Sequence, residues 1–226
     1  MSGDRNGAGG GRPRALVWDM DGTLLDSGEV VPDAFVETVR RLGGATPSRA
    51  EVVALYALGP PRIMLTRLLQ RPCTEEELDL YHSVLADTAV GAVVYPGIRA
   101  ALDALHGSVP LAVFTGASRR AARILLSATG LADRFDAVVG GDEVTRQKPD
   151  PEGVLSACRH LGVDARDAVY AGDAPRDLLA ARAAGARAAA AGWGHQYDPG
   201  APADLTLRKP EDLLPVFGRP TGPAPA

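Results

Sequence analysis

Residues 17–27 read Val-Trp-Asp-Met-Asp-Gly-Thr-Leu-Leu-Asp-Ser (VWDMDGTLLDS), so that two carboxylates, Asp19 and Asp21, stand one residue apart directly after a short apolar run. A short continuous apolar run that ends at polar residues and Gly is typical of a buried strand. In an open parallel sheet, ligands bind beyond the carboxyl ends of the strands. The two acids therefore mark a candidate functional site at one edge of a predicted sheet.

Four further apolar runs follow along the chain, and segments with helical spacing separate them. Ile98, Ala101 and Leu105, for example, recur three and four residues apart between the first run and the second. Alternation of continuously apolar strands with amphipathic helices predicts an α/β fold with a parallel sheet between two layers of helices. The predicted strands are ALVWD (15–19), PLAVF (110–114), DAVVG (136–140), AVYAG (168–172) and RAAAA (187–191).

An all-helical insert interrupts this alternation directly after the first strand. Ser48 with Glu51, and Thr74 with Glu77, have the spacing of helix capping boxes, and no strand pattern lies near them. We therefore predict a helical domain within an α/β core. The expected ranges are 14–27 and 95–217 for the core, 28–94 for the insert, and 1–13 and 218–226 for tails with too little apolar surface to remain ordered.

Composition narrows the classes of protein that the chain can belong to. Of its 226 residues 46% are hydrophobic, and the formal net charge is −4, which gives no indication of nucleic-acid binding. No apolar segment has the length of a signal peptide or a membrane span. Cys73 and Cys158 are far apart and lack metal-binding spacing, which fits a reducing compartment. We expect a cytoplasmic protein with a small-molecule partner, a monomer by default with a dimer left open.

Polar residues follow the other predicted strands at the same edge of the sheet. Because four crowded carboxylates would repel one another and raise one another's pKa, a cation is expected to offset their charge. Oxygen ligands without a His or Cys cluster are typical of Mg²⁺. The residues at this edge, besides Asp19 and Asp21, are Thr115, Gly116 and Ala117 after the second strand, Lys148 after the third, and Asp173 and Asp177 after the fourth.

This set of side chains has the composition of a phosphoryl-transfer site. Asp19 would attack phosphorus, while Asp21 would protonate the leaving oxygen and later take a proton from water. The hydroxyl of Thr115 and the backbone N–H groups of Gly116 and Ala117, where the next helix opens, would hold phosphate oxygens. A carboxylate nucleophile forms an aspartyl-phosphate, which divides a slow hydrolysis into two easier steps.

The ordered motifs resemble the haloacid-dehalogenase-like superfamily, and specifically its phosphoglycolate-phosphatase and β-phosphoglucomutase branch. The resemblance covers residues 14–216 and implies a Rossmann-like core with a small helical cap between the first and second motifs. The Thr of the second motif is commonly followed by Asn in this branch, whereas Gly116 stands here, so a side-chain amide is missing. The matching motifs are Asp19-x-Asp21-Gly22-Thr23, Thr115, Lys148-Pro149 and Gly172-Asp173-x-x-x-Asp177.

The resemblance also implies roles for individual residues. Asp19 is the nucleophile and a metal ligand, and Asp21 is the acid/base, whose backbone carbonyl also ligates Mg²⁺. Asp173 is a metal ligand, and Asp177 binds the metal through water or orients the site. Lys148 acts on the phosphate together with Thr115. Dehalogenases of the superfamily generally lack the second acid of the first motif, so Asp21 favours phosphate chemistry.

The leading hypothesis is therefore a Mg²⁺-dependent phosphatase that hydrolyses a small phosphomonoester, phosphoglycolate-like or sugar-phosphate-like, through an aspartyl-phosphate. A β-phosphoglucomutase-like phosphomutase and a non-catalytic phosphate-binding module stay open as alternatives. The cap is expected to close over the substrate about hinges near Gly28 and residues 95–97.

Several of these residues also have purely structural interpretations. Lys148 would then be a solvated loop lysine, and Asp173 and Asp177 would only favour the amino end of a helix. Arg62 stands between two helical patterns of the insert, where it either faces the phosphate as a substrate-binding residue or remains on the surface. His195 either borders the site or is a surface residue. The sequence leaves these alternatives open.

Overall fold

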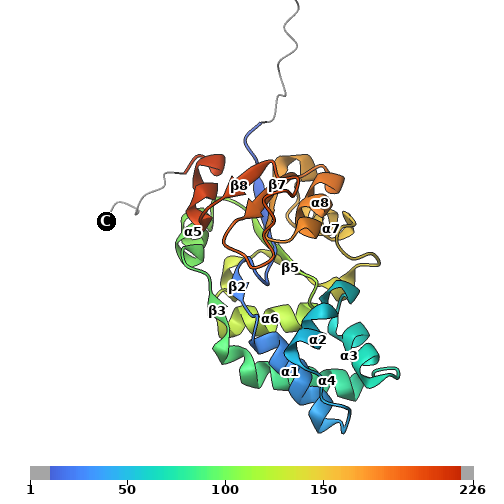
Figure 1. Cartoon of the computed structure of the whole chain (residues 1–226). Helices are drawn as coiled ribbons and strands as arrows, with labels where there is room; N and C mark the ends of the chain where they lie inside the picture. Colours follow the sequence, from blue (N-terminus) through green and yellow to red (C-terminus); the bar gives the residue numbers. More distant parts are fainter. Residues whose placement is uncertain (1–10, 220–226) are drawn as a thin grey trace, which may run out of the picture.

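A six-stranded parallel sheet forms the centre of the protein in the computed structural model, which describes residues 11–219 (Figure 1). Every neighbouring pair of strands in this sheet is parallel, so all the carboxyl ends lie at one edge. The predicted α/β fold is confirmed. The strands are ordered β5 (Ala137–Val139), β4 (Leu111–Phe114), β1 (Ala15–Trp18), β6 (Ala168–Gly172), β7 (Arg187–Ala191) and β8 (Leu205–Leu207).

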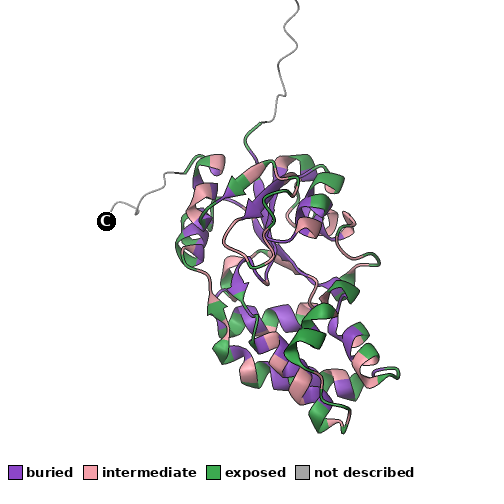
Figure 2. Ribbon diagram, in the orientation of Figure 1, coloured by how far each residue is buried: buried purple, intermediate pink, exposed green. Residues whose placement is uncertain are grey.

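Helices cover both faces of the sheet, which is why the strands β4, β1 and β6 are buried at every position. Leu16 and Trp18 of β1 belong to the hydrophobic core on one face, and Val17 between them belongs to the core on the other. Figure 2 shows the sheet and the inward sides of the helices as one buried layer. The first face packs against α5 (Ile98–Leu105), α6 (Arg119–Ala128) and the 3-10 helix η6 (Pro210–Phe217), and the second against α7 (Glu152–His160) and α8 (Pro175–Ala184).

Between the first and second strands of the core the chain forms a group of helices, drawn at the lower end of Figure 1. Both capping boxes expected from the sequence are present, since Ser48 and Thr74 each accept a hydrogen bond from the backbone N–H three residues later. The core on the first face of the sheet continues into these helices through Phe35 and Tyr81. The helices are α1 (Val30–Arg41), α2 (Arg49–Ala54), α3 (Pro61–Leu69) and α4 (Glu75–Thr88), with the 3-10 helix η1 (Tyr56–Leu58) between α2 and α3.

A narrow antiparallel ribbon joins this helical insert to the core. It pairs β2 (Leu25–Asp26) with β3 (Val93–Val94), so the two passages of the chain between insert and core lie side by side. The sequence did not indicate this ribbon, because two residues are too few to show alternation. The helical insert thus enters and leaves the core at the same place, next to the carboxyl end of β1.

Strand β8 and the two predicted tails remain to be compared with the structure. Strand β8 was not predicted, because Leu205–Leu207 is short and follows a loop rich in Pro and Gly. The predicted disordered tails, 1–13 and 218–226, lie outside the described residues apart from 11–13 and 218–219. Pro13 is buried, and the backbone N–H of Arg219 donates to the Leu214 carbonyl at 2.8 Å.

Within residues 11–219, no helix has the length and apolarity that crossing a membrane requires.

Candidate active site

The candidate site lies where the direction of the sheet's connections reverses. From β1 the chain continues to β4 and β5 on one side, and then returns past β1 to β6 on the other. Such a switch point opens a crevice at the carboxyl ends of the central strands. Asp19 follows β1 at this crevice; its backbone N–H donates to the Ala171 carbonyl at 2.8 Å, and the residue is only 6% exposed.

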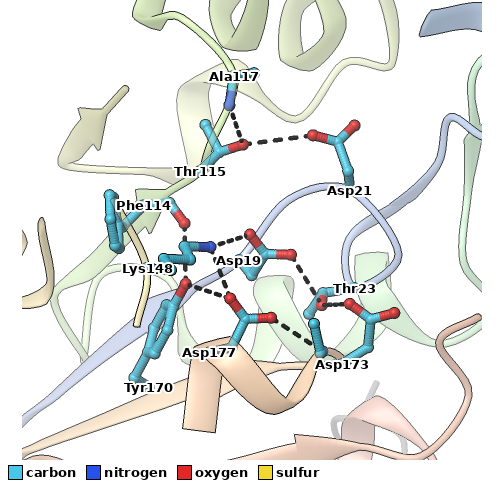
Figure 3. Close-up of polar contacts among 11 residues, drawn as sticks. Asp19, Asp21, Thr23, Phe114, Thr115, Ala117, Lys148, Tyr170, Asp173 and Asp177 are labelled. Atoms are coloured by element: carbon cyan, nitrogen blue, oxygen red, sulfur yellow. Dashed lines mark hydrogen bonds and ion pairs between the residues drawn. The ribbon is translucent and has the colours of Figure 1, made fainter. Parts of the chain in front are cut away.

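The side chain of Lys148 is buried in the site. Its Nζ donates to Asp19 Oδ1 at 2.5 Å and lies 2.8 Å from Asp177 Oδ1, and its side chain is 5% exposed (Figure 3). The ammonium also faces two aromatic rings, Phe114 at 4.8 Å and Tyr170 at 5.3 Å from the ring centroids. Burial lowers the pKa of Lys148, but the two carboxylates outweigh this effect and raise it overall. The interpretation of Lys148 as a solvated loop lysine is therefore wrong.

Asp173 and Asp177 lie at the start of α8, beside Asp19. One carboxylate oxygen from each of these three residues lies within 4.8 Å of the others. Asp177 also accepts the Ala174 N–H at 3.0 Å, so the same carboxylate both stabilises the amino end of the helix and belongs to the acidic cluster. Asp173 accepts the backbone N–H of Gln196 at 2.9 Å. The structural interpretation of Asp177 is thus confirmed, and its place in the acidic cluster is compatible with the functional one.

The buried cluster carries more negative than positive charge. Three carboxylates face one ammonium, and burial raises the pKa of Asp19 to about 8 although Lys148 opposes the shift. Burial also raises the pKa of Asp173. With all its carboxylates ionised, the cluster has a net charge near −2, which one divalent cation would balance. The donor set fits such a hard cation, because it consists of carboxylate oxygens with no sulfur or imidazole nitrogen among the clustered ligands.

Asp21 faces away from Lys148 and toward a separate set of hydroxyl groups (Figure 3). Thr115 Oγ1 lies 3.4 Å from Asp21 Oδ2, and the hydroxyl of Ser27 donates to Asp21 Oδ1. Burial raises the pKa of Asp21, which favours the protonated carboxyl. The two acids of the first motif therefore have different surroundings, although one residue separates them.

In the loop after β4, one of the two backbone N–H groups that were predicted to bind phosphate is already hydrogen-bonded. The backbone N–H of Ala117 donates to Thr115 Oγ1 at 3.1 Å, so this N–H already has a partner within the loop. At Gly116 a Cβ would meet no heavy atom within 4 Å. The space that a side chain would occupy at this position is therefore open. Ser118, and not Thr115, caps α6, since its hydroxyl accepts the Ala121 N–H.

Two glycines allow the backbone to approach Asp173 closely. Gly22 has φ +84°, and a Cβ there would lie 2.5 Å from Asp173 Oδ2. At Gly194 a Cβ would lie 2.2 Å from Asp173 Cβ. The Asp-Gly pair of the first motif is therefore a turn as well as part of the site, because the turn brings Thr23 to 3.4 Å from both Asp19 and Asp173.

A cavity of about 200 Å³ lies between this cluster and the helical insert. It is lined from the core by six of the predicted residues, and the insert supplies the opposite wall. The sequence did not single out three further polar side chains that line it, Tyr56, Gln147 and Arg176. His195 lines the cavity too, with Nδ1 4.0 Å from Asp173 Oδ2, so it borders the site. The six predicted residues are Asp19, Asp21, Thr115, Gly116, Ala117 and Lys148.

Arg62 is not among the residues that line this cavity. Its guanidinium donates to the Cys73 carbonyl at 3.1 Å and lies 2.6 Å from Glu75 Oε2, both within the insert. The reason is local: Pro61 is the first residue of α3, so Arg62 is part of a helix and not of a loop. The placement differs from the expected contact with phosphate.

Comparison with known proteins gives a consistent set of relatives. Residues 13–185 match the haloacid dehalogenase-like hydrolases. The chain is 34% identical over 220 residues to phosphoglycolate phosphatase 1 of Pseudomonas aeruginosa, a match that covers 90% of this chain and 79% of that protein. It is 32% identical over 223 residues to the N-acetylmuramic acid 6-phosphate phosphatase of the same organism, covering 92% and 96%. Among solved structures, CbbY from Rhodobacter sphaeroides in complex with phosphate is similar, with a TM-score of 0.76, 26% identity, and coverage of 89% and 96%.

Proposed function

Because the chain belongs to the haloacid dehalogenase-like hydrolase family, we propose that it is a phosphatase in which Asp19 attacks the phosphorus of a small phosphomonoester. One observation carries the proposal. Asp19 is buried, is held by Lys148, and opens onto a cavity into which a second carboxyl, that of Asp21, also faces. The relatives that cover most of the chain bear the names of phosphatases, which supports the same chemistry.

Two carboxyl groups divide the proposed reaction between them. In the first step an oxygen of Asp19 bonds to phosphorus while the ester P–O bond breaks, and Asp21 gives its proton to the leaving alcohol oxygen. The raised pKa of Asp21 favours the protonated form that this step needs. In the second step Asp21 takes a proton from water, whose oxygen bonds to phosphorus and releases phosphate from Asp19. Lys148 provides positive charge next to the phosphoryl oxygens in both steps.

Mg²⁺ is the cation that we propose for the acidic cluster, held by Asp19, Asp173 and Asp177 together with the backbone carbonyl of Asp21. When bound, it supplies the positive charge that the cluster lacks and that the phosphoryl oxygens need. This assignment rests on the three clustered carboxylates and on the excess of negative charge around Lys148.

Removal of divalent cations tests the metal site. We expect phosphate release to fall by about 10²-fold or more after chelation and dialysis, since several kcal/mol of charge stabilisation is lost. Added Mg²⁺ should restore the rate. Phosphate release is measured directly, with the residual metal content determined in the same sample. Undiminished activity in protein shown to be free of metal would contradict the proposal.

Phosphate hydrolysis fits the cavity better than transfer within a sugar. None of the described residues that the insert contributes to the cavity is charged, so this wall offers no counter-charge for the second phosphate of a bisphosphorylated sugar. The test is incubation with a sugar 1-phosphate, for which we expect free phosphate and no 6-phosphate product.

We also propose that residues 28–94 act as a cap domain over the site, in a cytoplasmic and monomeric protein. The narrow β2–β3 ribbon next to Gly28 and residues 95–97 supports hinges at these positions. Contacts between α4 and α6 would hold the closed form: His82 Nε2 lies 2.9 Å from Ser118 Oγ, and Arg120 forms an ion pair with Asp79.

A further inference from the structure

The wall that the helical insert contributes to the cavity is almost entirely apolar. Among the described residues, the side chains of this wall carry no charge, and their only strongly polar atoms near the cluster are two tyrosine hydroxyls. The wall continues to the surface through Val53, which is 46% exposed and also lines the cavity. Its main side chains are Val31, Phe35, Val53, Tyr56, Met64 and Tyr81.

The two tyrosine hydroxyls of this wall are neutral, and the charge of Asp21 acts on both of them. The Tyr56 hydroxyl is buried and has no hydrogen-bond partner in the described part of the chain. Burial raises the pKa of Tyr56, and the charge of Asp21 raises it further. Burial also raises the pKa of Tyr81, and Tyr56 and Asp21 add to this effect. The rings of Phe35 and Tyr81 pack against each other at a tilt of 34°, with centroids 4.4 Å apart. The wall therefore offers aromatic surface and neutral hydroxyls.

The basic side chains that line the cavity come from the core, on the side opposite this wall. Lys148 contacts both Asp19 and Asp177. His195 lies near Asp173, and Arg176 belongs to the same turn of α8 as Asp177. A substrate held with its phosphoryl group at Asp19 would therefore direct its alcohol portion at the apolar wall. An anionic group at that wall would lose its hydration without gaining a counter-charge, which is strongly unfavourable.

We propose that the site prefers phosphomonoesters of small, uncharged and mainly apolar alcohols to esters with an anionic alcohol portion such as phosphoglycolate. This preference rests on the phosphatase function proposed above, and Val53 and Tyr56 are specificity-determining residues of the wall. The cavity volume of about 200 Å³ limits the size of the alcohol portion of the substrate. An apolar cavity of roughly 150 Å³ holds a benzene ring, so a short branched chain or a single ring is the expected upper size beside the phosphoryl group.

A matched pair of esters tests the preference in the unmodified protein. Isobutyl phosphate and phosphoglycolate have the same number of heavy atoms and both release a primary alcohol, but two methyl groups replace the two carboxylate oxygens. We expect kcat/KM to be higher for isobutyl phosphate by about tenfold or more, because only the carboxylate is left without a partner at the wall. Higher kcat/KM for phosphoglycolate would overturn the proposal.

A matched pair of variants tests whether the wall causes the preference. Val53→Arg adds a cation beside the cavity, and Leu58→Arg adds the same side chain at a residue of similar exposure, 42%, that does not line the cavity. We expect Val53→Arg to shift the ratio of the two kcat/KM values toward phosphoglycolate by about tenfold, as a new ion pair across a partly desolvated site would do. Leu58→Arg should leave the ratio unchanged. Equal ratios in the two folded variants would overturn the role of the wall.

Two further outcomes separate this inference from the proposed function. If phosphoglycolate is preferred and Arg176→Gln removes that preference, a cation of the core receives the carboxylate and the inference fails while the phosphatase function stands. If neither ester nor 4-nitrophenyl phosphate releases phosphate in the presence of Mg²⁺, the proposed function itself fails, and with it the inference that rests on it.

Discussion

Asn in place of Asp19 should abolish phosphate release, with an expected fall in kcat of about 10⁴-fold or more. The amide that replaces the carboxylate has nearly the same shape but is not a nucleophile, so no aspartyl-phosphate can form. The substitution also removes one of three crowded carboxylates and leaves Lys148 paired with Asp177 at 2.8 Å. The free energy of unfolding should therefore change little, and the loss of activity would come from the chemistry.

Asp26→Asn provides the control for this experiment. Asp26 belongs to the same stretch of sequence, but it is exposed on β2 and does not line the cavity. Its variant should retain the kcat of the unmodified protein. Phosphate release and thermal unfolding are measured on both variants. A folded Asp19→Asn protein that keeps a large part of the activity would rule out the proposed nucleophile.

Lys148→Met should lower both activity and stability. The ammonium is the one cation that contacts Asp19 and Asp177 directly in the described structure, so its removal leaves buried carboxylates without a partner. We expect the free energy of unfolding of the metal-free protein to fall by about 3 kcal/mol, as for other broken buried ion pairs. Without this charge near the phosphoryl oxygens, kcat should fall by about 10³-fold. Denaturant unfolding and phosphate release measure the two effects.

Arginine should not rescue this position. The guanidinium group is planar and larger than an ammonium, whereas Lys148 fits between two carboxylates and the rings of Phe114 and Tyr170. Lys148→Arg should therefore also be defective. Lys209→Met and Lys209→Arg are the matched controls, because Lys209 is exposed and lies outside the cavity. A Lys148→Arg protein with normal kcat would show that positive charge alone is sufficient.

The sequence predicted the core strands well because the sheet is covered on both faces. A strand that is buried on both faces is almost continuously apolar, so AVYAG and the four alanines of RAAAA stand out from their surroundings, and β6 and β7 have the same bounds as these predicted strands. Asp19 and Asp173 could be predicted because they directly follow such strands, and Lys148 because it follows one through a short loop. The parallel direction of the strands was therefore enough to predict that Asp19, Lys148 and Asp173 lie at the same edge of the sheet.

The opposite wall of the cavity could not be predicted in the same way. Tyr56 lies in the short 3-10 helix η1, and no local pattern shows which way its ring faces. Its position depends on how the insert packs against the core, which contacts distant in sequence decide. Arg62 illustrates the same limit, because the start of α3 at Pro61 directs it to Glu75 within the insert.

The chain contains only two lysines, so the reactivity of each amine can be followed separately. Lysine occurs only at 148 and 209, although lysine and arginine together number 24. The amine of Lys209 is exposed, whereas the Lys148 side chain is 5% exposed and held by two carboxylates. If the proposed cap opens, an amine-selective reagent would acylate Lys209 at once and Lys148 only in the open form. Mass spectrometry of the two peptides would give the acylation rate of each lysine, and the rate at Lys209 would serve as the reference for the rate at Lys148.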